Sequence, residues 1–187
     1  MRPQAPLEDT LRGIRIAITA LTAMLAVAAG RAFGLSLEEC AAGLASTPLT
    51  KARLQITEIN GIQFIDDSYN ANPDSMKAAL RTLVELDADG RRVAVLGEMS
   101  ELGEESERGH REVGEAAAAF GIDELIAVGA TGAEIARAAQ QAGLRKSISV
   151  ADAGEAAGLL GETASPGDLI LVKGSRSARM ERVLEVF

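Results

Sequence analysis

Polar side chains suited to binding a nucleotide gather in one short segment, Asp66-Asp67-Ser68-Tyr69-Asn70-Ala71-Asn72-Pro73. This segment contains the only Tyr of the chain and two of its three Asn. A carboxylate at the end of a strand can accept hydrogen bonds from a ribose diol, and an aromatic ring beside amides can hold a planar base. With Asn72 as N-cap and Pro73 as first helical residue, the free N–H groups of a helix would point at the same place. The segment therefore predicts a binding loop.

The same segment also has a purely structural interpretation, a capped turn between a strand and a helix. Asn, Asp and Pro are the residues that such turns use most often. That interpretation explains Asn72 and Pro73, but it does not account for Asp66, Asp67 and Tyr69 as well.

A second candidate segment is Val172-Lys173-Gly174-Ser175-Arg176, which also follows an apolar run. Taken alone, it could be a simple helix entry, with Gly for the turn, Ser as a cap and Arg in solvent. The residues by themselves leave both interpretations open.

Two other groups of polar residues are expected to be structural. His110 is the only histidine, so it cannot build a histidine metal cluster. We expect it to be a solvated helix residue, and the alternative is a role at the substrate cleft. The carboxylates that precede it are expected to form a solvated loop and a favourable helix start rather than a metal site. These are Glu98, Glu101, Glu104, Glu105 and Glu107.

The elements that position these segments alternate between strand and helix. After the candidate loop, strands are expected at 93–96, 125–128, 147–150 and 169–172, each followed by a helix, at about 110–120, 133–141, 155–160 and 177–184. Wholly apolar strands imply burial on both faces. The expected fold is therefore α/β, a Rossmann-like, mostly parallel sheet with helices on both faces, preceded by a short helical segment. Ligands of such sheets bind beyond the carboxyl ends of the strands, where both candidate segments lie.

A hairpin is expected to lead into this sheet. Arg53–Glu58 alternates apolar and polar residues, Asn60-Gly61 is a strong turn signal, and Ile62–Ile65 continues as a strand. After Pro73, a helix is expected with one apolar face, formed by Met76, Ala79, Leu80, Leu83 and Val84.

Residues 1–50 stand apart from this pattern. The run Ile16–Ala29 predicts a buried, Ala-rich helix that ends at Gly30, and Ser36 with Glu39 predicts a capping box for a second helix. Cys40 is expected to be a small buried hydrophobe of that helix. Thr47-Pro48-Leu49-Thr50 then breaks the helical pattern and marks a domain boundary.

Composition excludes several classes of protein. The 187 residues carry a formal charge of −8 without a basic stripe, which argues against nucleic-acid binding. The single cysteine cannot form an internal disulfide, which fits a protein of a reducing compartment. Arg12 and Arg15 before Ile16–Ala29 imitate a secretory signal, but this run is shorter than the roughly 20 residues of a membrane span. We therefore expect a cytoplasmic protein without a membrane partner.

At the block from Asp67 to Ser75 the chain resembles the MurF family of Mur ligases. The resemblance continues at Leu96-Gly97-Glu98-Met99, Glu101-Leu102-Gly103 and His110-Arg111-Glu112-Val113-Gly114, and returns at Val172–Arg176. It covers the chain from about Ser36 onward. The loop at 68–72 differs from that of neighbouring Mur and folylpolyglutamate ligases, which normally carries a histidine.

The resemblance implies an ATP-dependent ligase that joins D-alanyl-D-alanine to UDP-N-acetylmuramoyl-tripeptide in peptidoglycan synthesis, and thus serves the cell wall, cell shape and cell division. Such ligases form an acyl phosphate on the tripeptide, which the amine of the dipeptide then attacks. They have a UDP-sugar domain, a central P-loop ATPase and a C-terminal Rossmann-like domain. Here residues 1–50 would be a helical remnant of the central domain and residues 51–187 the C-terminal domain.

The resemblance also implies roles for single residues. For ATP it implies a phosphate contact from Arg53, a ribose contact from Asp67, and contacts near the adenine from Tyr69, Asn70 and Asn72. For the incoming dipeptide it implies contacts from Lys173, Ser175 and Arg176. The family usually has Gly where Ala52 stands.

No Gly-x-x-x-x-Gly-Lys-Ser/Thr phosphate loop occurs in this sequence. We therefore expect the chain to be inactive alone, to share ATP with the missing central domain, and to contain no ligands for the Mg²⁺ of the full enzyme. The alternative function is a non-catalytic nucleotide- or peptide-binding module that docks to a partner.

Overall fold

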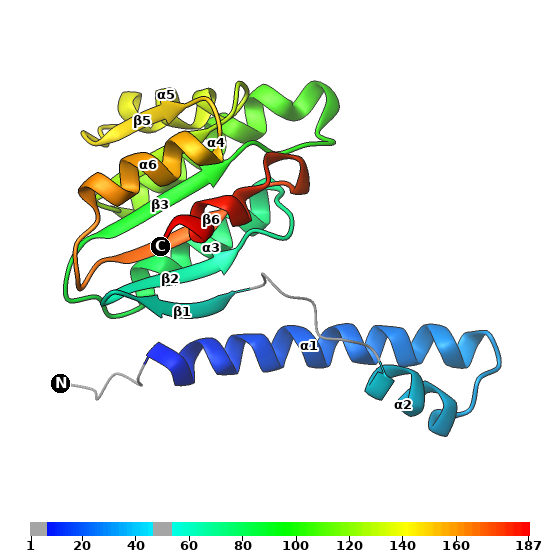
Figure 1. The fold of residues 1–187 in the computed structure, drawn as a ribbon. Coiled ribbons are helices and arrows are strands. Elements are labelled where there is room, and N and C mark those ends of the chain that lie inside the picture. Colours follow the sequence, from blue (N-terminus) through cyan, green and yellow to red (C-terminus); the bar gives the residue numbers. More distant parts are fainter. Residues whose placement is uncertain (1–6, 47–53) are drawn as a thin grey trace. The chain divides into compact units, whose positions relative to one another are not determined.

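The computed structural model describes residues 7–46 and 54–187, and the chain divides into two compact units, Met1–Thr50 and Lys51–Phe187 (Figure 1). The first unit contains helices, and the second contains a six-stranded sheet and its helices. The boundary expected at Thr47–Thr50 lies outside the described residues.

Two helices make up the described part of the first unit, α1 (Leu7–Ala32) and α2 (Leu37–Ser46). α1 passes the predicted stop at Gly30, because the turn that ends it is built at Gly34, with a φ of +90°. Gly34 N donates to Arg31 O at 3.1 Å, and Leu35 N donates to Gly30 O at 3.0 Å. This bond pair is the Schellman motif, in which a glycine takes the left-handed position just after the helix.

The predicted burial of α1 is wrong for the part of it whose side chains are described. Leu21, Met24 and Leu25 are 57%, 62% and 64% exposed. A pair of helices shares only one seam, so most of the α1 surface has no covering element within this unit.

The predictions for the start of α2 are confirmed. Glu39 N donates to Ser36 Oγ at 3.1 Å, and Ser36 N donates to Glu39 Oε2 at 2.8 Å, which completes the capping box. Cys40 is buried, and a Cβ atom added at Gly30 would lie 2.7 Å from its sulfur. Gly30 therefore allows close helix packing rather than ending α1.

The second unit is built on a sheet with the strand order β1-β2-β6-β3-β4-β5. Its strands are β1 (Gln55–Ile59), β2 (Ile62–Asp67), β3 (Arg92–Gly97), β4 (Glu124–Val128), β5 (Ser147–Val150) and β6 (Leu169–Lys173). All neighbouring pairs are parallel except β1 and β2. The α/β class with a mostly parallel sheet is therefore confirmed. Burial on both faces fails at the edge strand β5, where Ile148 is exposed, since that strand has only one neighbour.

The predicted hairpin joins β1 to β2. Ile59 pairs with Ile62, and the two residues between them, Asn60 and Gly61, have φ values of +54° and +76°. These left-handed values define a type I′ turn, whose twist matches that of the strands. The turn sets the register that places Asp66 and Asp67 at the far end of β2.

Helices cover both faces of the sheet. α6 (Ala153–Thr163) and the C-terminal segment cover one face and share a core with inward residues such as Phe64, Val95 and Val172 (Figure 1). The other helices are α3 (Pro73–Glu85), α4 (Ser106–Phe120), which follows the 3-10 turn η1 (Gly103–Glu105), and α5 (Ala133–Gln141). The predicted face of α3 is confirmed except that Val84 is half-buried and Thr82 is buried.

The last predicted helix is wrong in type. Residues 177–184 fall in two 3-10 segments, η2 (Arg176–Ala178) and η3 (Met180–Val186), separated at Arg179 with a φ of +48°. Met180 is fully buried, and a Cβ at Gly174 would lie 2.6 Å from its Cγ atom. The break at Arg179 lets Met180 pack against the ends of β3 and β6, where a straight helix would carry it away.

Within residues 7–46 and 54–187, no helix is long and apolar enough to cross a membrane. The same residues contain no group of three or more His, Cys, Asp or Glu side chains arranged to hold a metal ion.

Candidate functional site

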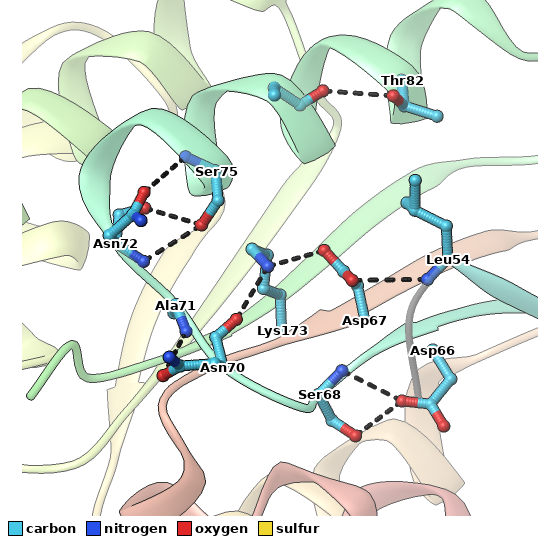
Figure 2. A network of polar contacts seen from close by, with 11 residues as sticks. Leu54, Asp66, Asp67, Ser68, Asn70, Ala71, Asn72, Ser75, Thr82 and Lys173 are labelled. Atoms are coloured by element: carbon cyan, nitrogen blue, oxygen red, sulfur yellow. Dashed lines mark hydrogen bonds and ion pairs between the residues drawn. The ribbon is translucent and has the colours of Figure 1, made fainter. Parts of the chain in front are cut away.

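The two candidate segments meet at the carboxyl edge of the sheet. β2 and β6 are parallel neighbours whose last paired residues are Asp67 and Lys173. Lys173 Nζ donates to Asp67 Oδ2 at 2.6 Å and to Asn70 O at 2.9 Å, as Figure 2 shows. Residues 106 positions apart in the sequence thus form one ion pair that holds the polar loop against β6.

This ion pair is largely shielded from water, and one of its two carboxylate oxygens has only a weak hydrogen-bond donor among the described residues. The Lys173 side chain is 3% exposed and that of Asp67 is 15% exposed. Among the described residues, the second oxygen of Asp67, Oδ1, accepts one long bond, from Leu54 N at 3.3 Å. Burial raises the pKa of the Asp67 carboxyl above its ordinary value, although the charge and hydrogen bond of Lys173 act in the opposite direction. A carboxylate in this state has the capacity to accept hydrogen bonds from a ligand.

The remainder of the loop is held by short-range hydrogen bonds. Asp66 Oδ1 accepts from Ser68 N at 3.1 Å and from Ser68 Oγ at 2.6 Å. Asn70 Oδ1 accepts from Ala71 N at 2.9 Å. Tyr69 projects partly into solvent, with 41% of its surface exposed. These contacts fix the path of the loop and leave the phenol ring accessible.

Asn72 has the structural role that the capped-turn interpretation gives it. Its Oδ1 accepts from Ser75 N at 2.8 Å, and Ser75 Oγ accepts from Asn72 N at 3.0 Å. This capping box starts α3 at Pro73 (Figure 2). The α3 N-terminus therefore faces the loop as expected, with the side-chain oxygen of Asn72 already engaged.

The predicted residues of the second candidate segment, Val172–Arg176, differ in burial. Ser175 is buried, and its hydroxyl lies 3.1 Å from that of Ser100 and 2.9 Å from that of Ser177. Arg176 is 71% exposed and pairs loosely with Glu181 at 3.6 Å. Lys173 and Ser175 are thus built into the edge of the sheet, while Arg176 extends from it. Arg53, predicted to contact phosphate, lies outside the described residues.

The loop after β3 contributes residues that were not singled out. Glu98 O accepts from Ser175 N at 3.0 Å, and Glu98 Oε2 accepts from Thr131 Oγ1 at 3.0 Å. The loops after β3, β4 and β6 are thereby joined at one residue. The sequence placed Glu98 in a solvated acidic run and in the family motif Leu96-Gly97-Glu98-Met99, without predicting this connecting role.

The expectation of a solvated His110 is wrong, because this side chain is fully buried. Its spacing explains the burial, since Val113, Gly114 and Ala117 lie three, four and seven positions further along and are also buried. That pattern marks one face of a helix. The charged neighbours on the opposite face concealed it in the sequence.

A cavity of about 400 Å³ lies where α4 and α5 begin. Its lining includes Ser106, Glu107, His110, Thr131, Glu134 and Arg137. Arg137 is already paired with Glu134 at 2.5 Å, so the guanidinium is not free to act as an anion site.

Comparison with known proteins assigns the chain and its fold to a family. The family model described as "Mur ligase, glutamate ligase domain" matches residues 52–176, and the chain belongs to that family. Within the family, its similarity is to the C-terminal domain of MurF-type ligases. It is 36% identical over 167 residues to the UDP-N-acetylmuramoyl-tripeptide–D-alanyl-D-alanine ligase of Bacillus subtilis, covering 88% of this chain and 36% of that one. It is 41% identical over 170 residues to the ligase of the same name from Escherichia coli, covering 87% and 35%.

Solved structures agree. A MurF structure from Acinetobacter baumannii matches with a TM-score of 0.65 at 32% identity, over 83% of this chain and 34% of that one. The MurF ligase from Thermotoga maritima in complex with ADP matches with a TM-score of 0.58 at 30% identity, over 86% and 35%. The chain thus spans about a third of the length of these relatives.

Proposed function

We propose that this chain supplies the nucleotide- and dipeptide-binding part of a cytoplasmic, ATP-dependent ligase. That ligase would add D-alanyl-D-alanine to UDP-N-acetylmuramoyl-tripeptide, the reaction in the names of its relatives. Residues 51–187 are the C-terminal domain in this proposal, and residues 1–50 belong to the central domain of the family. The remaining ligase domains would supply the phosphate loop and the ligands of Mg²⁺.

The observation that carries the proposal is the Asp67–Lys173 pair at the carboxyl edge of the sheet. Asp67 is largely buried, its Oδ1 has one long donor among the described residues, and it lies at the topological position where α/β sheets bind ligands. In our proposal Asp67 accepts hydrogen bonds from the ribose of ATP, and the accessible Tyr69 ring, with Asn70 and Asn72, approaches the adenine. The ADP in the Thermotoga maritima relative supports a nucleotide site in this class of protein.

The dipeptide is assigned to the second candidate segment in the same proposal. Lys173, Ser175 and Arg176 follow or end β6, and Ser175 is tied to the loop after β3 through Glu98 O. Arg53, by the resemblance, would contact phosphate. Positioning and charge stabilisation, rather than a protein nucleophile, are what such chemistry requires of these residues.

Calorimetric titration of the purified chain with ADP and with D-alanyl-D-alanine, each alone, tests the binding roles. We expect measurable binding of ADP by the native chain and its loss in Asp67→Ala. Asp74→Ala is the matched control, because this nearby carboxylate is 97% exposed and should not affect binding. Equal ADP affinity in Asp67→Ala and the native chain would overturn the ribose assignment.

A phosphate-release assay tests the expectation of no ligase activity. The chain with ATP, Mg²⁺, UDP-N-acetylmuramoyl-tripeptide and D-alanyl-D-alanine should release no phosphate above background. Release above background would contradict the assignment of the phosphate-binding machinery to other domains.

A non-catalytic docking module remains the second candidate, favoured by the apolar surface of the first unit. Leu21, Met24, Leu25 and Phe33 are all more than half exposed, with Phe33 at 89%. Exposed apolar groups of this kind mark interaction surfaces. Absence of ADP and dipeptide binding, together with concentration-dependent association through this surface, would favour docking over the ligase role.

A further inference from the structure

His110 connects α4 to the loop that follows β3 through two backbone groups, besides a longer contact of 3.5 Å between its Nδ1 atom and the Ser106 hydroxyl. Its Nε2 atom accepts a hydrogen bond from Met99 N at 2.9 Å. Its Nδ1 atom lies 2.6 Å from Ser106 O, one turn earlier on α4. The ring is fully buried and Met99 is 2% exposed, so water cannot easily replace either partner.

The two partners determine which nitrogen carries the proton. A carbonyl oxygen only accepts, so Nδ1 must donate to Ser106 O, and an amide N–H only donates, so Nε2 must accept from Met99 N. Only the neutral ring with its proton on Nδ1 satisfies both bonds. A second proton, on Nε2, would place two donors face to face and remove the bond that holds Met99.

The segment held by this bond reaches the proposed site within one or two residues. Glu98, the neighbour of Met99, accepts from Ser175 N at 3.0 Å and from Thr131 Oγ1 at 3.0 Å. Ser100, on the other side, donates to Ser175 Oγ at 3.1 Å. The position of the Met99 backbone therefore controls how Ser175, at the end of β6, is presented.

Charged groups approach His110 from two elements. Glu107 of α4, and Glu134 and Arg137 of α5, line the same cavity as His110. Arg137 is neutralised by Glu134, and Glu98 is linked to the cavity through Thr131. None of these groups takes either of the two hydrogen bonds that the ring makes.

We propose that His110 is a positioning residue, whose neutral Nδ1–H form fixes the loop 98–103 and through it Ser175. The functional part of this inference rests on the proposed dipeptide site. The positioning itself depends only on the structure of this chain, so the two can fail separately.

Nuclear magnetic resonance of the intact chain tests the positioning directly, since His110 is the only histidine and its ring signals need no assignment by mutation. At neutral pH the ¹⁵N shifts should show a protonated Nδ1 and an unprotonated Nε2, and the Met99 amide should exchange slowly with solvent. A proton on Nε2 at neutral pH, or rapid exchange of the Met99 amide, would overturn the proposal.

Two substitutions separate positioning from simple packing. His110→Gln can present a side-chain oxygen to Met99 N, so it should keep most of the protection of the Met99 amide. His110→Phe fills the space without an acceptor, so Met99 amide exchange should accelerate at least tenfold while α4 and the sheet stay protected. Unchanged Met99 protection in His110→Phe would show that packing alone holds the loop.

Dipeptide titration then tests the functional part. D-Alanyl-D-alanine affinity should fall several-fold in His110→Phe and stay close to the native value in His110→Gln. If the native chain binds no dipeptide while the resonance results hold, the proposed function fails and the positioning role stands. If the dipeptide binds equally to all three proteins, the link between the loop and the site is wrong.

Discussion

Strand β6 has an ion pair at each end, and the amino-end pair is fully supplied with hydrogen bonds. Asp168 Oδ1 accepts from Arg91 N at 2.8 Å, and its Oδ2 accepts from Arg91 Nη2 at 2.6 Å and from Ser165 N at 3.0 Å. Arg91 also pairs with Glu124 at 2.8 Å and donates to Thr163 O at 2.6 Å. These contacts tie the starts of β3, β4 and β6 to the end of α6.

The carboxyl-end pair is also largely buried and is less completely bonded. The Asp67 side chain is 15% exposed, against 3% for Asp168, and among the described residues it accepts one short bond, from Lys173, and one long bond, from Leu54 N. At the amino end of β6, both oxygens of the Asp168 carboxylate accept short hydrogen bonds. At the carboxyl end, Asp67 Oδ1 accepts only the long bond from Leu54 N among the described residues.

The pKa values of the Asp168 and Asp67 carboxyls are shifted in opposite directions. Burial alone would raise the pKa of Asp168, but the hydrogen bonds from the Arg91 side chain and from the Arg91 and Ser165 amides outweigh it and hold that pKa below its ordinary value. For Asp67, burial prevails over the attraction of Lys173, and its pKa is raised. Burial prevails for Asp67 and the supply of donors prevails for Asp168, and together they distinguish the structural carboxylate from the candidate binding group.

Asp168→Asn should have the largest effect on folding. It removes the charge that organises Arg91 and leaves a buried amide whose N–H₂ group faces donors. We expect a loss of about 3 kcal/mol in the free energy of unfolding, since removing one partner of a buried pair costs roughly 3–5 kcal/mol. Urea denaturation followed by circular dichroism measures it.

The control is Asp123→Asn, because this exposed carboxylate accepts a single bond from Arg92 N, at 2.7 Å. It should cost well under half as much. Equal losses in the two variants would show that Asp168 is an ordinary surface acceptor.

Lys173→Met tests the other end of the strand. We expect a loss of about 2 kcal/mol, less than for Asp168→Asn, because Asp67 can take up a proton once its partner is gone. The double variant Asp67→Asn/Lys173→Met should recover most of that loss, since no buried charge remains. If Lys173→Met lowers the free energy of unfolding as much as Asp168→Asn does, and the double variant does not recover the loss, both ion pairs have a purely structural role.

The pH dependence of stability should differ in sign between the two carboxyls. Asp168 has a lowered pKa in the folded chain, so its stabilisation is complete above the ordinary aspartate value of about 3.9 and is lost as the pH falls through the folded value. Asp67 has a raised pKa, so its contribution is complete below about 3.9 and declines as the pH rises through the folded value.

The measurement is the free energy of unfolding of the native chain minus that of each Asn variant, between about pH 3 and pH 6. The difference for Asp168→Asn should grow as the pH rises, and the difference for Asp67→Asn should shrink. Parallel slopes for the two variants would refute the contrast between the pairs.

The sequence sufficed for much of the architecture because local signals agreed with the tertiary fold. Asn60-Gly61 specified the hairpin, Asn72-Pro73 specified the start of α3, and the apolar runs specified the buried strands. The ion pair of Asp67 with Lys173 was not visible, because it depends on β6 inserting between β2 and β3. Strand order is a property of the whole sheet, which no local pattern records.

Where the sequence misled, tertiary packing overrode a local pattern. The acidic run concealed the connecting role of Glu98, and charged neighbours concealed the burial of His110. The last segment has helical periodicity, yet the need to bury Met180 breaks it at Arg179. The roles of Arg53, Asp67, Tyr69 and the other site residues in binding stay predictions.

Asn72→Ala should have the smallest effect on stability. It tests which residues at the carboxyl edge of the sheet are structural and which bind the ligand. The side chain caps α3 through Ser75 N, so its loss should cost about 1 kcal/mol of stability. Since Asn72 Oδ1 is already engaged, ADP affinity should change less than twofold, whereas Asp67→Ala should abolish binding. Urea denaturation and calorimetry on the same preparations measure both. A larger loss of ADP affinity than of stability would show that Asn72 binds the nucleotide, as the family resemblance implies. The ligand would then compete with the helix cap for the Asn72 side chain.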